Sequence, residues 1–186
     1  DRVGGIVFGD EFGAEIKPKA NRPTRDRFLT AISRANQLLR ADAPAIGTPM
    51  SLSTPLRTAA RIARRNHLVI VISDFDGLDE QTASLIGRIA STNDLILCPV
   101  TDPIAGEIPA GLKLVVSDGE LQVELDTASG EIHKRLSDFS SDRLSKILSW
   151  QKRYGLPVLP LSAGEDTIPQ VQRLTGLTFV GRRPLP

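Results

Sequence analysis

One short segment limits what this chain can fold into. Residues 68–72 read LVIVI, an uninterrupted aliphatic run that is mostly β-branched. A strand of this composition is buried on both faces, which is typical of a central strand in a parallel sheet covered by helices. A helical pattern over about 78–92 follows, and then a second apolar strand over 95–100. This order predicts a right-handed strand–helix–strand unit within an α/β fold.

Hairpins, helices and a late strand are predicted around this unit. Turn residues between β-prone runs indicate the hairpins, and apolar residues at helical spacing indicate the helices. In chain order, the predicted elements are a hairpin of strands 3–8 and 14–16, helices over about 24–40 and 55–65, a hairpin of strands 113–116 and 121–125, a long helical stretch ending near 154, a strand at 157–161 and a helix at 167–174. A slip in the helical spacing near 140–141 predicts either a kink there or two abutting helices. Together they predict one domain with a mostly parallel sheet and helices on both faces.

Composition and charge exclude several classes of protein. The chain has 186 residues, of which 40% are hydrophobic and 24% charged, as in a globular domain and unlike a disordered one. The net charge of +1 argues against a surface dedicated to nucleic acid or membrane. The single cysteine, Cys98, excludes an internal disulfide and suits a reducing compartment, so we expect a cytoplasmic protein. No apolar run approaches the roughly 20 residues of a membrane span.

Two carboxylates follow the central strand directly, Asp74 and Asp76. In open α/β sheets, ligands bind beyond the carboxyl ends of the strands. Two carboxylates at that position suit a hard divalent cation such as Mg²⁺. A structural alternative stays open, in which Asp74 caps the next helix and Asp76 forms a turn with Gly77.

One resemblance connects these carboxylates to catalysis. Residues 70–77, IVISDFDG, are similar to the opening motif of haloacid-dehalogenase-like phosphatases. The resemblance implies that Asp74 is the nucleophile and Asp76 the general acid/base. The motif departs from the family at Leu78, where Thr or Val is usual, and it lies well inside the chain instead of on its first strand. Supporting residues in this interpretation are Thr101 for phosphate, Glu165 and Asp166 for magnesium, and Lys113.

A second resemblance runs the length of the chain. The segments that carry it are DRVGGIVFG at 1–9, LVIVISDF at 68–75, VTDP at 100–103 with IP at 108–109, LDTASGE at 125–131, RYGL at 153–156 and LPLS at 159–162. In their order and spacing they resemble the bacterial family called domain of unknown function 58, a branch of the von Willebrand factor A-like domains. The resemblance implies a Rossmann-like sheet and a non-enzymatic module for protein interaction.

The same resemblance implies a metal-ion-dependent adhesion site. Such domains hold Mg²⁺ through Asp-x-Ser-x-Ser after the first strand, a Thr from a second loop and an Asp after the fourth strand. Asp74 matches that Asp, whereas the position of the Thr falls at Met50, which cannot ligate a hard cation. The expected metal ligands are therefore Asp74, Asp76, Thr48 and Ser51, with Ser53 as a further candidate. A structural module with a degenerate metal site is a third interpretation, which Met50 favours.

The resemblance also implies that a strand is missing. The chain opens on Asp1 without Met, and the first strand with its Asp-x-Ser-x-Ser would precede it, so we interpret residues 1–186 as an N-terminally truncated domain. The missing strand would lie between strands 3–8 and 68–72 and leave two apolar edges unpaired. We expect these edges to pair directly or to be filled by another chain, as in a homodimer.

The expected partner is a protein. Members of the resembled family are commonly encoded beside MoxR-type AAA+ ATPases and are thought to act with them in assembling or maturing protein complexes. We therefore expect a protein partner of that kind, no nucleic acid and no membrane contact by this segment. In this interpretation Mg²⁺ binds in a longer protein and not to residues 1–186 alone.

Overall fold

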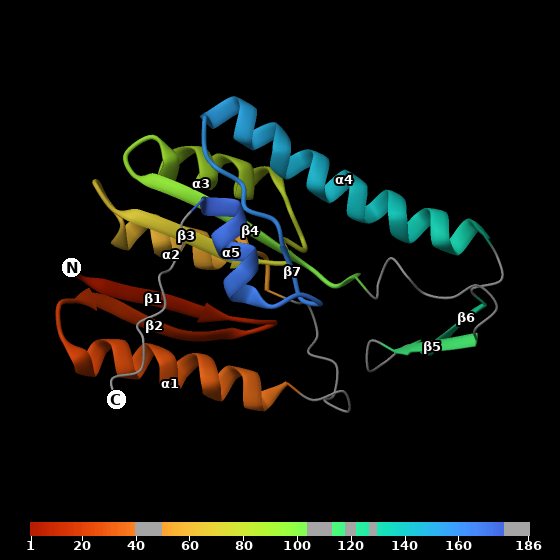
Figure 1. Cartoon of the computed structure of the whole chain (residues 1–186), viewed down its shortest axis with the longest axis horizontal. Coiled ribbons are helices and arrows are strands. Elements are labelled where there is room, and N and C mark those ends of the chain that lie inside the picture. The colour runs from red at the N-terminus through yellow and green to blue at the C-terminus, as the bar shows by residue number, and fades with distance from the viewer. Residues whose placement is uncertain (40–49, 104–112, 118–121, 127–129, 177–186) are drawn as a thin grey trace, which may run out of the picture.

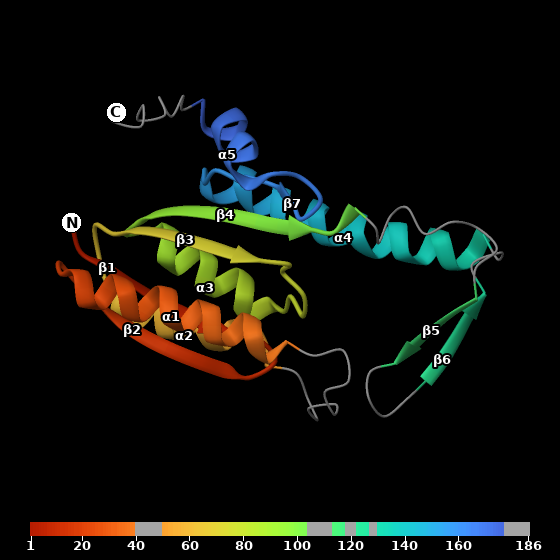
Figure 2. The same cartoon turned by 60° about the horizontal axis from the view of Figure 1, so that its bottom comes forward.

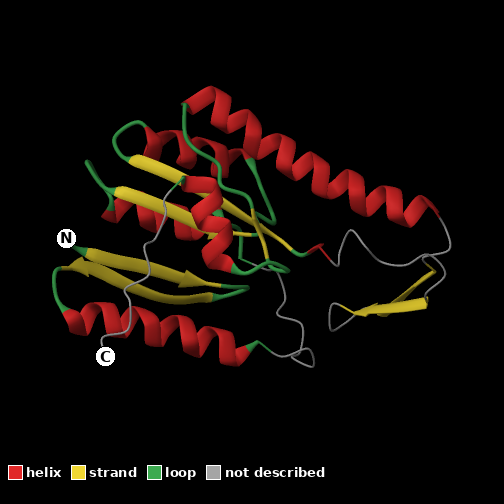
Figure 3. Ribbon diagram, in the orientation of Figure 1, coloured by secondary structure: helices red, strands yellow, loops and turns green. Residues whose placement is uncertain are grey.

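The computed structural model describes residues 1–39, 50–103, 113–117, 122–126 and 130–176. As predicted, the chain is mixed α/β, and its helices and strands alternate along most of its length (Figures 1 and 3). The elements are β1 (Val3–Phe8), β2 (Phe12–Lys19), α1 (Arg22–Leu38), α2 (Ser53–Ile62), β3 (Leu68–Ser73), α3 (Glu80–Ala90), β4 (Asp94–Thr101), β5 (Lys113–Ser117), β6 (Gln122–Asp126), α4 (Gly130–Tyr154), β7 (Leu161–Ser162) and α5 (Thr167–Thr175).

The predicted parallel unit is confirmed. β3 and β4 pair in parallel from Leu68 opposite Asp94 to Ser73 opposite Pro99, and α3 connects them. β7 pairs in parallel with the carboxyl end of β4, so this sheet has the order β3-β4-β7. All three strands therefore place their carboxyl ends at the same edge, where the loop that contains Asp74 begins.

Both predicted hairpins are present as antiparallel pairs, β1 with β2 and β5 with β6. The alternative of two abutting helices near 140–141 is wrong, because α4 is one continuous helix from Gly130 to Tyr154. Serine is only moderately unfavourable in a helix, so the two serines at that position do not interrupt the backbone hydrogen bonds. Gly155 ends the helix with a φ of 66°, a conformation that glycine adopts without steric cost.

The core lies between the parallel sheet and helices α2, α3 and α4. One cluster of buried side chains joins Val71 of β3, Leu97 of β4, Ile86 of α3 and Trp150 of α4. Helix α5 lies on the other side of β4 from α3, as the two helices show above and below that strand in Figure 2. The predicted placement of helices on both faces of the sheet therefore holds around β4.

Strand β3 departs from the prediction that it is buried on both faces. Val71 is buried, but Leu68, Ile70 and Ile72 are 62%, 51% and 61% exposed. Alternate residues of a strand point to opposite faces, so one face of β3 packs on the core and the other is open in the described part of the chain. The continuous run of hydrophobic residues correctly predicted a strand at 68–72, but it wrongly predicted that both faces of the strand are buried.

A buried glutamine holds α5 to β7. The Gln170 side chain accepts a hydrogen bond from the Ser162 amide (2.7 Å) and donates to the carbonyls of Ser162 (2.8 Å) and Glu165 (2.9 Å). Its amide therefore acts as a substitute strand partner for the end of the sheet. Among the described residues, no helix combines the length and the apolar character required to cross a membrane.

Candidate functional site

The loop from Asp74 to Asp79 connects β3 to α3 at the carboxyl edge of the sheet. Asp74 and Asp76 are exposed there. The Asp74 Oδ1 atom accepts hydrogen bonds from the Ser73 hydroxyl and from the Asp76 amide, each at 3.2 Å. The structural alternative in which Asp74 caps the next helix is wrong, because Asp79 is the N-cap of α3. Asp74 therefore shapes the loop and still presents its second oxygen to solvent.

Phe75 anchors this loop between its two carboxylates. Its side chain is fully buried in the core cluster, although its φ is 56°. That left-handed backbone is unusual for a bulky residue and costs free energy, which the burial of the ring offsets. Because the ring points inward, the neighbouring carboxylates are directed outward. No signal in the sequence predicted this conformation.

Arg143 of α4 reaches the same loop from a distant part of the sequence. Its Nη1 donates to the Asp74 carbonyl at 3.1 Å, and its Nη2 donates to the Asp76 carboxylate at 3.0 Å. The side chain of Arg143 is 25% exposed and that of Asp76 is 65% exposed. One of the two carboxylates thus already has a cationic partner, and the loop is tied to α4.

The second predicted loop contacts the Asp74–Asp79 loop at its far end, through Asp79. The Ser51 hydroxyl is 3.2 Å from Asp79 Oδ2 and 3.1 Å from the Ser53 hydroxyl. Met50 donates its backbone N–H to the Asp10 carbonyl at 3.0 Å. Thr48, the other candidate ligand in this loop, lies outside the described residues.

Asp79 receives a dense set of hydrogen bonds as the cap of α3. Its Oδ1 accepts from the hydroxyl and from the amide of Thr82, both at 2.6 Å, and the Thr82 hydroxyl in turn accepts from the Asp79 amide. The hydroxyl of Thr82, and then its amide, lower the pKa of Asp79 below its ordinary value. A charged cap at a helix N-terminus also interacts favourably with the helix dipole.

Replacing Asp79 by alanine is expected to lower the free energy of unfolding by about 1 kcal/mol, since a lost N-cap typically costs 0.5–2 kcal/mol. Because folding lowers the pKa of Asp79, its ionisation contributes stability above its unfolded pKa near 3.8. That contribution is lost as the pH falls through the lower folded value. Urea unfolding from pH 7 down to pH 3 measures both effects.

Asp79→Asn is the matched control for charge, since it keeps a cap oxygen and removes the ionisation. At pH 7 we expect the free energy of unfolding of this variant to lie between those of the wild type and Asp79→Ala. The variant should also lack the loss of stability that ionisation of Asp79 causes as the pH falls. Equal stability of all three proteins at pH 7 contradicts the capping role.

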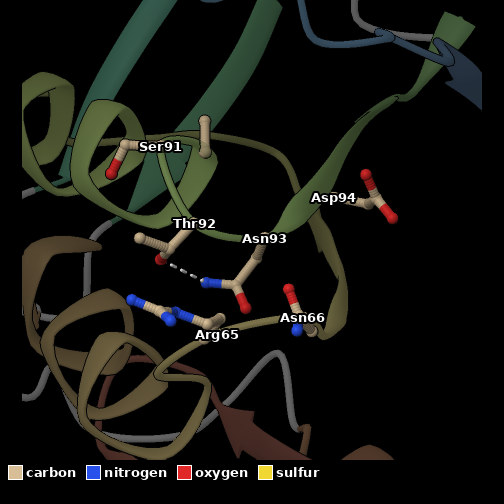
Figure 4. A pocket seen from close by; sticks show the side chains of 7 residues that line it. Arg65, Asn66, Ser91, Thr92, Asn93 and Asp94 are labelled. Atoms are coloured by element: carbon tan, nitrogen blue, oxygen red, sulfur yellow. Dashed lines mark hydrogen bonds between the residues drawn. The ribbon is translucent and has the colours of Figure 1, made fainter.

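A shallow polar pocket lies at the opposite, amino-terminal end of β3 and β4 (Figure 4). It is lined by Arg65, Asn66, Ala90, Ser91, Thr92, Asn93 and Asp94. The Asn93 amide donates to the carbonyls of Ala63 and Ile89, and its oxygen accepts from the His67 amide at 3.0 Å. Asn93 therefore joins the ends of α2 and α3 to the start of β3, which is a structural task.

The described residues do not assemble a metal centre by themselves. They contain no group of three or more His, Cys, Asp or Glu side chains placed to hold an ion. Glu165, expected to complete a magnesium site in the phosphatase interpretation, forms an ion pair with Arg173 at 3.0 Å. Thr101 donates to the Leu161 carbonyl at 3.4 Å, and the side chain of Lys113 is not described. The Asp74–Asp79 loop therefore presents two exposed carboxylates, those of Asp74 and Asp76, on a backbone that Phe75 and Arg143 hold in place.

Comparison with known proteins gives one match. The model of a family described as "Protein of unknown function DUF58" matches residues 1–143. That segment runs from β1 to Arg143 in α4 and includes the whole Asp74–Asp79 loop. Neither the curated proteins nor the solved structures contain a match.

Proposed function

The chain belongs to the family described as Protein of unknown function DUF58, and from this premise we propose that it is a protein-interaction module, not an enzyme, with the Asp74–Asp76 loop in its binding surface. The observation that carries the proposal is the construction of this loop. Phe75 anchors it in the core and Arg143 ties it to α4, while Asp74 stays exposed at the carboxyl edge of the sheet. A rigid, outward carboxylate is suited to recognition by a partner.

A second part of the proposal concerns the fold family and a bound metal ion. We propose a von Willebrand factor A-like arrangement in which Asp74 is one ligand of a Mg²⁺ site. Since the described residues do not form a metal centre, the remaining ligands would have to come from other segments, such as Thr48 or an Asp-x-Ser-x-Ser sequence. Arg143 beside Asp76 favours Asp74 over Asp76 as a ligand, because an added cation near Asp76 would meet a like charge.

The proposed partner is a MoxR-type AAA+ ATPase, and the proposed setting is cytoplasmic assembly or maturation of protein complexes. The partner is proposed from the resemblance to this family, and the cytoplasmic setting from the single cysteine. We propose that such a partner is recognised at the carboxyl edge of the β3-β4-β7 sheet, where Asp74 is exposed.

The test compares two aspartates at opposite ends of the sheet. Binding of the protein to a MoxR-type AAA+ ATPase from the same organism is measured by biolayer interferometry. Asp74→Asn is expected to weaken binding by about tenfold, which corresponds to about 1.4 kcal/mol. Asp94→Asn is the matched control, since Asp94 is exposed at the start of β4 and Figure 4 shows its carboxylate directed away from its neighbours. Asp94→Asn should change the Kd by less than about twofold.

Two other outcomes contradict the proposal and favour the alternatives. Equal binding by wild type and Asp74→Asn favours a structural module with a degenerate metal site. Hydrolysis of a generic phosphate ester in the presence of Mg²⁺, lost in Asp74→Asn, favours a phosphatase with Asp74 as the nucleophile. Glu165, which that interpretation expects to bind magnesium, pairs with Arg173 instead, so we expect no turnover.

A further inference from the structure

Asp76 and Gly77 place a carboxyl carbon and a backbone nitrogen side by side. The Gly77 amide donates a hydrogen bond to the Asp76 Oδ1 atom at 3.0 Å. Because the Cγ atom of Asp76 is bonded to Oδ1, the Gly77 nitrogen lies close to that carbon as well. Attack of the nitrogen on Cγ closes a five-membered imide ring, and two groups held in contact react with a large entropic advantage over separate ones.

Space and water are both available at this position. Gly77 has no side chain to shield its nitrogen, and its φ is 63°. A Cβ atom at Gly77 would meet nothing within 4 Å, so no neighbouring group among the described residues obstructs the ring. The Asp76 side chain is 65% exposed, which gives water access to the ring once it has formed.

Arg143 keeps the carboxyl group in place. Its Nη2 atom donates to the same Asp76 Oδ1 atom at 3.0 Å, and its Nη1 atom donates to the Asp74 carbonyl at 3.1 Å. Oδ1 therefore has two donors, the Gly77 amide and the Arg143 guanidinium. Negative charge develops on this oxygen when the nitrogen attacks Cγ, and a cation placed beside it stabilises that charge.

Asp74, in the same loop, lacks this arrangement. Its Oδ1 atom accepts hydrogen bonds from the Ser73 hydroxyl and from the Asp76 amide, which lies two residues further along the chain. The amide that directly follows Asp74 belongs to Phe75 and donates to the Ser73 hydroxyl at 3.0 Å. Phe75 also carries a large buried side chain beside that amide. The loop therefore contains one exposed aspartate that is placed to cyclise and one that is not.

We propose that Asp76–Gly77 is a modification site, at which the folded protein spontaneously converts aspartate into isoaspartate through a cyclic imide. The bond between the Gly77 nitrogen and the Asp76 Cγ atom forms, and the bond between Cγ and Oδ2 breaks. That oxygen leaves as water with the amide proton and the carboxyl proton. A second water then adds to the main-chain carbonyl carbon of Asp76 and breaks its bond to the Gly77 nitrogen, so that the main chain now runs through Cγ. The two steps require no oxidant, cofactor or enzyme.

The product changes the loop without changing its net charge. One methylene group enters the main chain between Phe75 and Gly77, and the former main-chain carbonyl of Asp76 becomes the free carboxylate. Oδ1 becomes a peptide oxygen, so its ion pair with Arg143 is lost. The class of reaction that would consume the product is methylation of this carboxylate by a methyltransferase that uses S-adenosylmethionine. The inference does not depend on whether Asp74 binds a partner, so it stands apart from the proposed function.

The test is an incubation of the whole purified chain at neutral pH over several weeks. Isoaspartate is located by electron-transfer fragmentation of tryptic peptides, and its total amount is measured by transfer of a labelled methyl group from S-adenosylmethionine with an isoaspartyl methyltransferase. We expect at least about tenfold more isoaspartate at position 76 than at position 74, which corresponds to a tenfold difference in rate. A peptide lighter by one water, with the imide at position 76, should appear before the isoaspartate.

Two controls separate the effect of the structure from that of the local sequence. Asp76→Glu keeps a carboxylate near Arg143 but would have to close a larger ring, so position 76 should stay unmodified. A free peptide of residues 72–80 has the same sequence without the fold, and the folded chain should convert at least as fast as this peptide. No isoaspartate at position 76, equal amounts at positions 74 and 76, an unchanged total in Asp76→Glu, or slower conversion in the folded chain than in the peptide overturns the proposal.

Discussion

Replacing Phe75 by alanine is expected to lower the free energy of unfolding by about 3–5 kcal/mol, a large part of the stability of a typical domain. The ring is fully buried among the side chains that join β3, α2 and α3. Its removal leaves a cavity at the base of the loop that carries Asp74 and Asp76. Urea unfolding followed by the fluorescence of Trp150, the single tryptophan, measures the loss.

Comparing Phe75→Gly with Phe75→Ala separates the loss of packing from the effect of backbone strain on stability. At most sites glycine is less stable than alanine by about 0.5–1 kcal/mol, because it loses more freedom on folding. At a φ of 56° an alanine still bears the steric cost of the left-handed conformation, whereas a glycine does not. Phe75→Gly is therefore expected to be at least as stable as Phe75→Ala. If Phe75→Gly is instead less stable than Phe75→Ala by the usual 0.5–1 kcal/mol, the strained conformation of the loop is contradicted.

The second large effect is expected at Gly5, where β1 packs against α1. A Cβ at this position would lie 2.2 Å from Cε2 and 2.3 Å from Cζ of the Phe28 ring. The ring is rigid and half-buried, so either α1 must move away from β1 or Phe28 must leave its site. Gly5→Ala is therefore expected to destabilise the protein by about 1–3 kcal/mol in urea unfolding, the usual cost of an overpacked contact.

Two further variants make the Gly5 experiment specific. Gly9→Ala is the matched control, because nothing lies within 4 Å of a Cβ there and it should be close to neutral. Gly5→Ala combined with Phe28→Ala should be less destabilised than the sum of the two single changes, since the smaller side chain removes the clash. Strict additivity contradicts the contact between Gly5 and Phe28.

Local patterns predicted the elements well. The aliphatic run at 68–72 forms β3, and the β-prone runs around turn residues form both hairpins. Periodic apolar residues located the helices, with bounds that differ by a few residues. These predictions succeed because β-branched strands, turns and amphipathic helices depend on neighbours within a few positions in the chain. The position of Asp74 directly after β3 was predicted on the same basis.

Contacts between segments that are distant in the sequence could not be predicted from such local patterns. Arg143 is separated from Asp76 by 67 positions, and nothing in the surrounding sequence marks it as a partner. The cap of α3 was assigned to Asp74 as an alternative, yet Asp79 takes that position because it, and not Asp74, stands three residues before Thr82. The phosphatase interpretation placed Glu165 near Asp74, whereas Glu165 pairs with Arg173 on α5. Each outcome depends on which elements come to lie side by side.

By itself, the sequence determined the α/β class, the parallel strand–helix–strand unit and the pair of aspartates at the end of β3, because each is encoded within a short window. Only the tertiary structure decided how those aspartates are used. The burial of Phe75 turns the two carboxylates outward, and the reach of Arg143 from α4 neutralises one of them. Tertiary structure also decided that β3 packs on the core through Val71 and leaves Leu68, Ile70 and Ile72 exposed in the described part of the chain. Hydrophobicity specifies that a side chain should be covered, but the element that covers it depends on the arrangement of the whole chain.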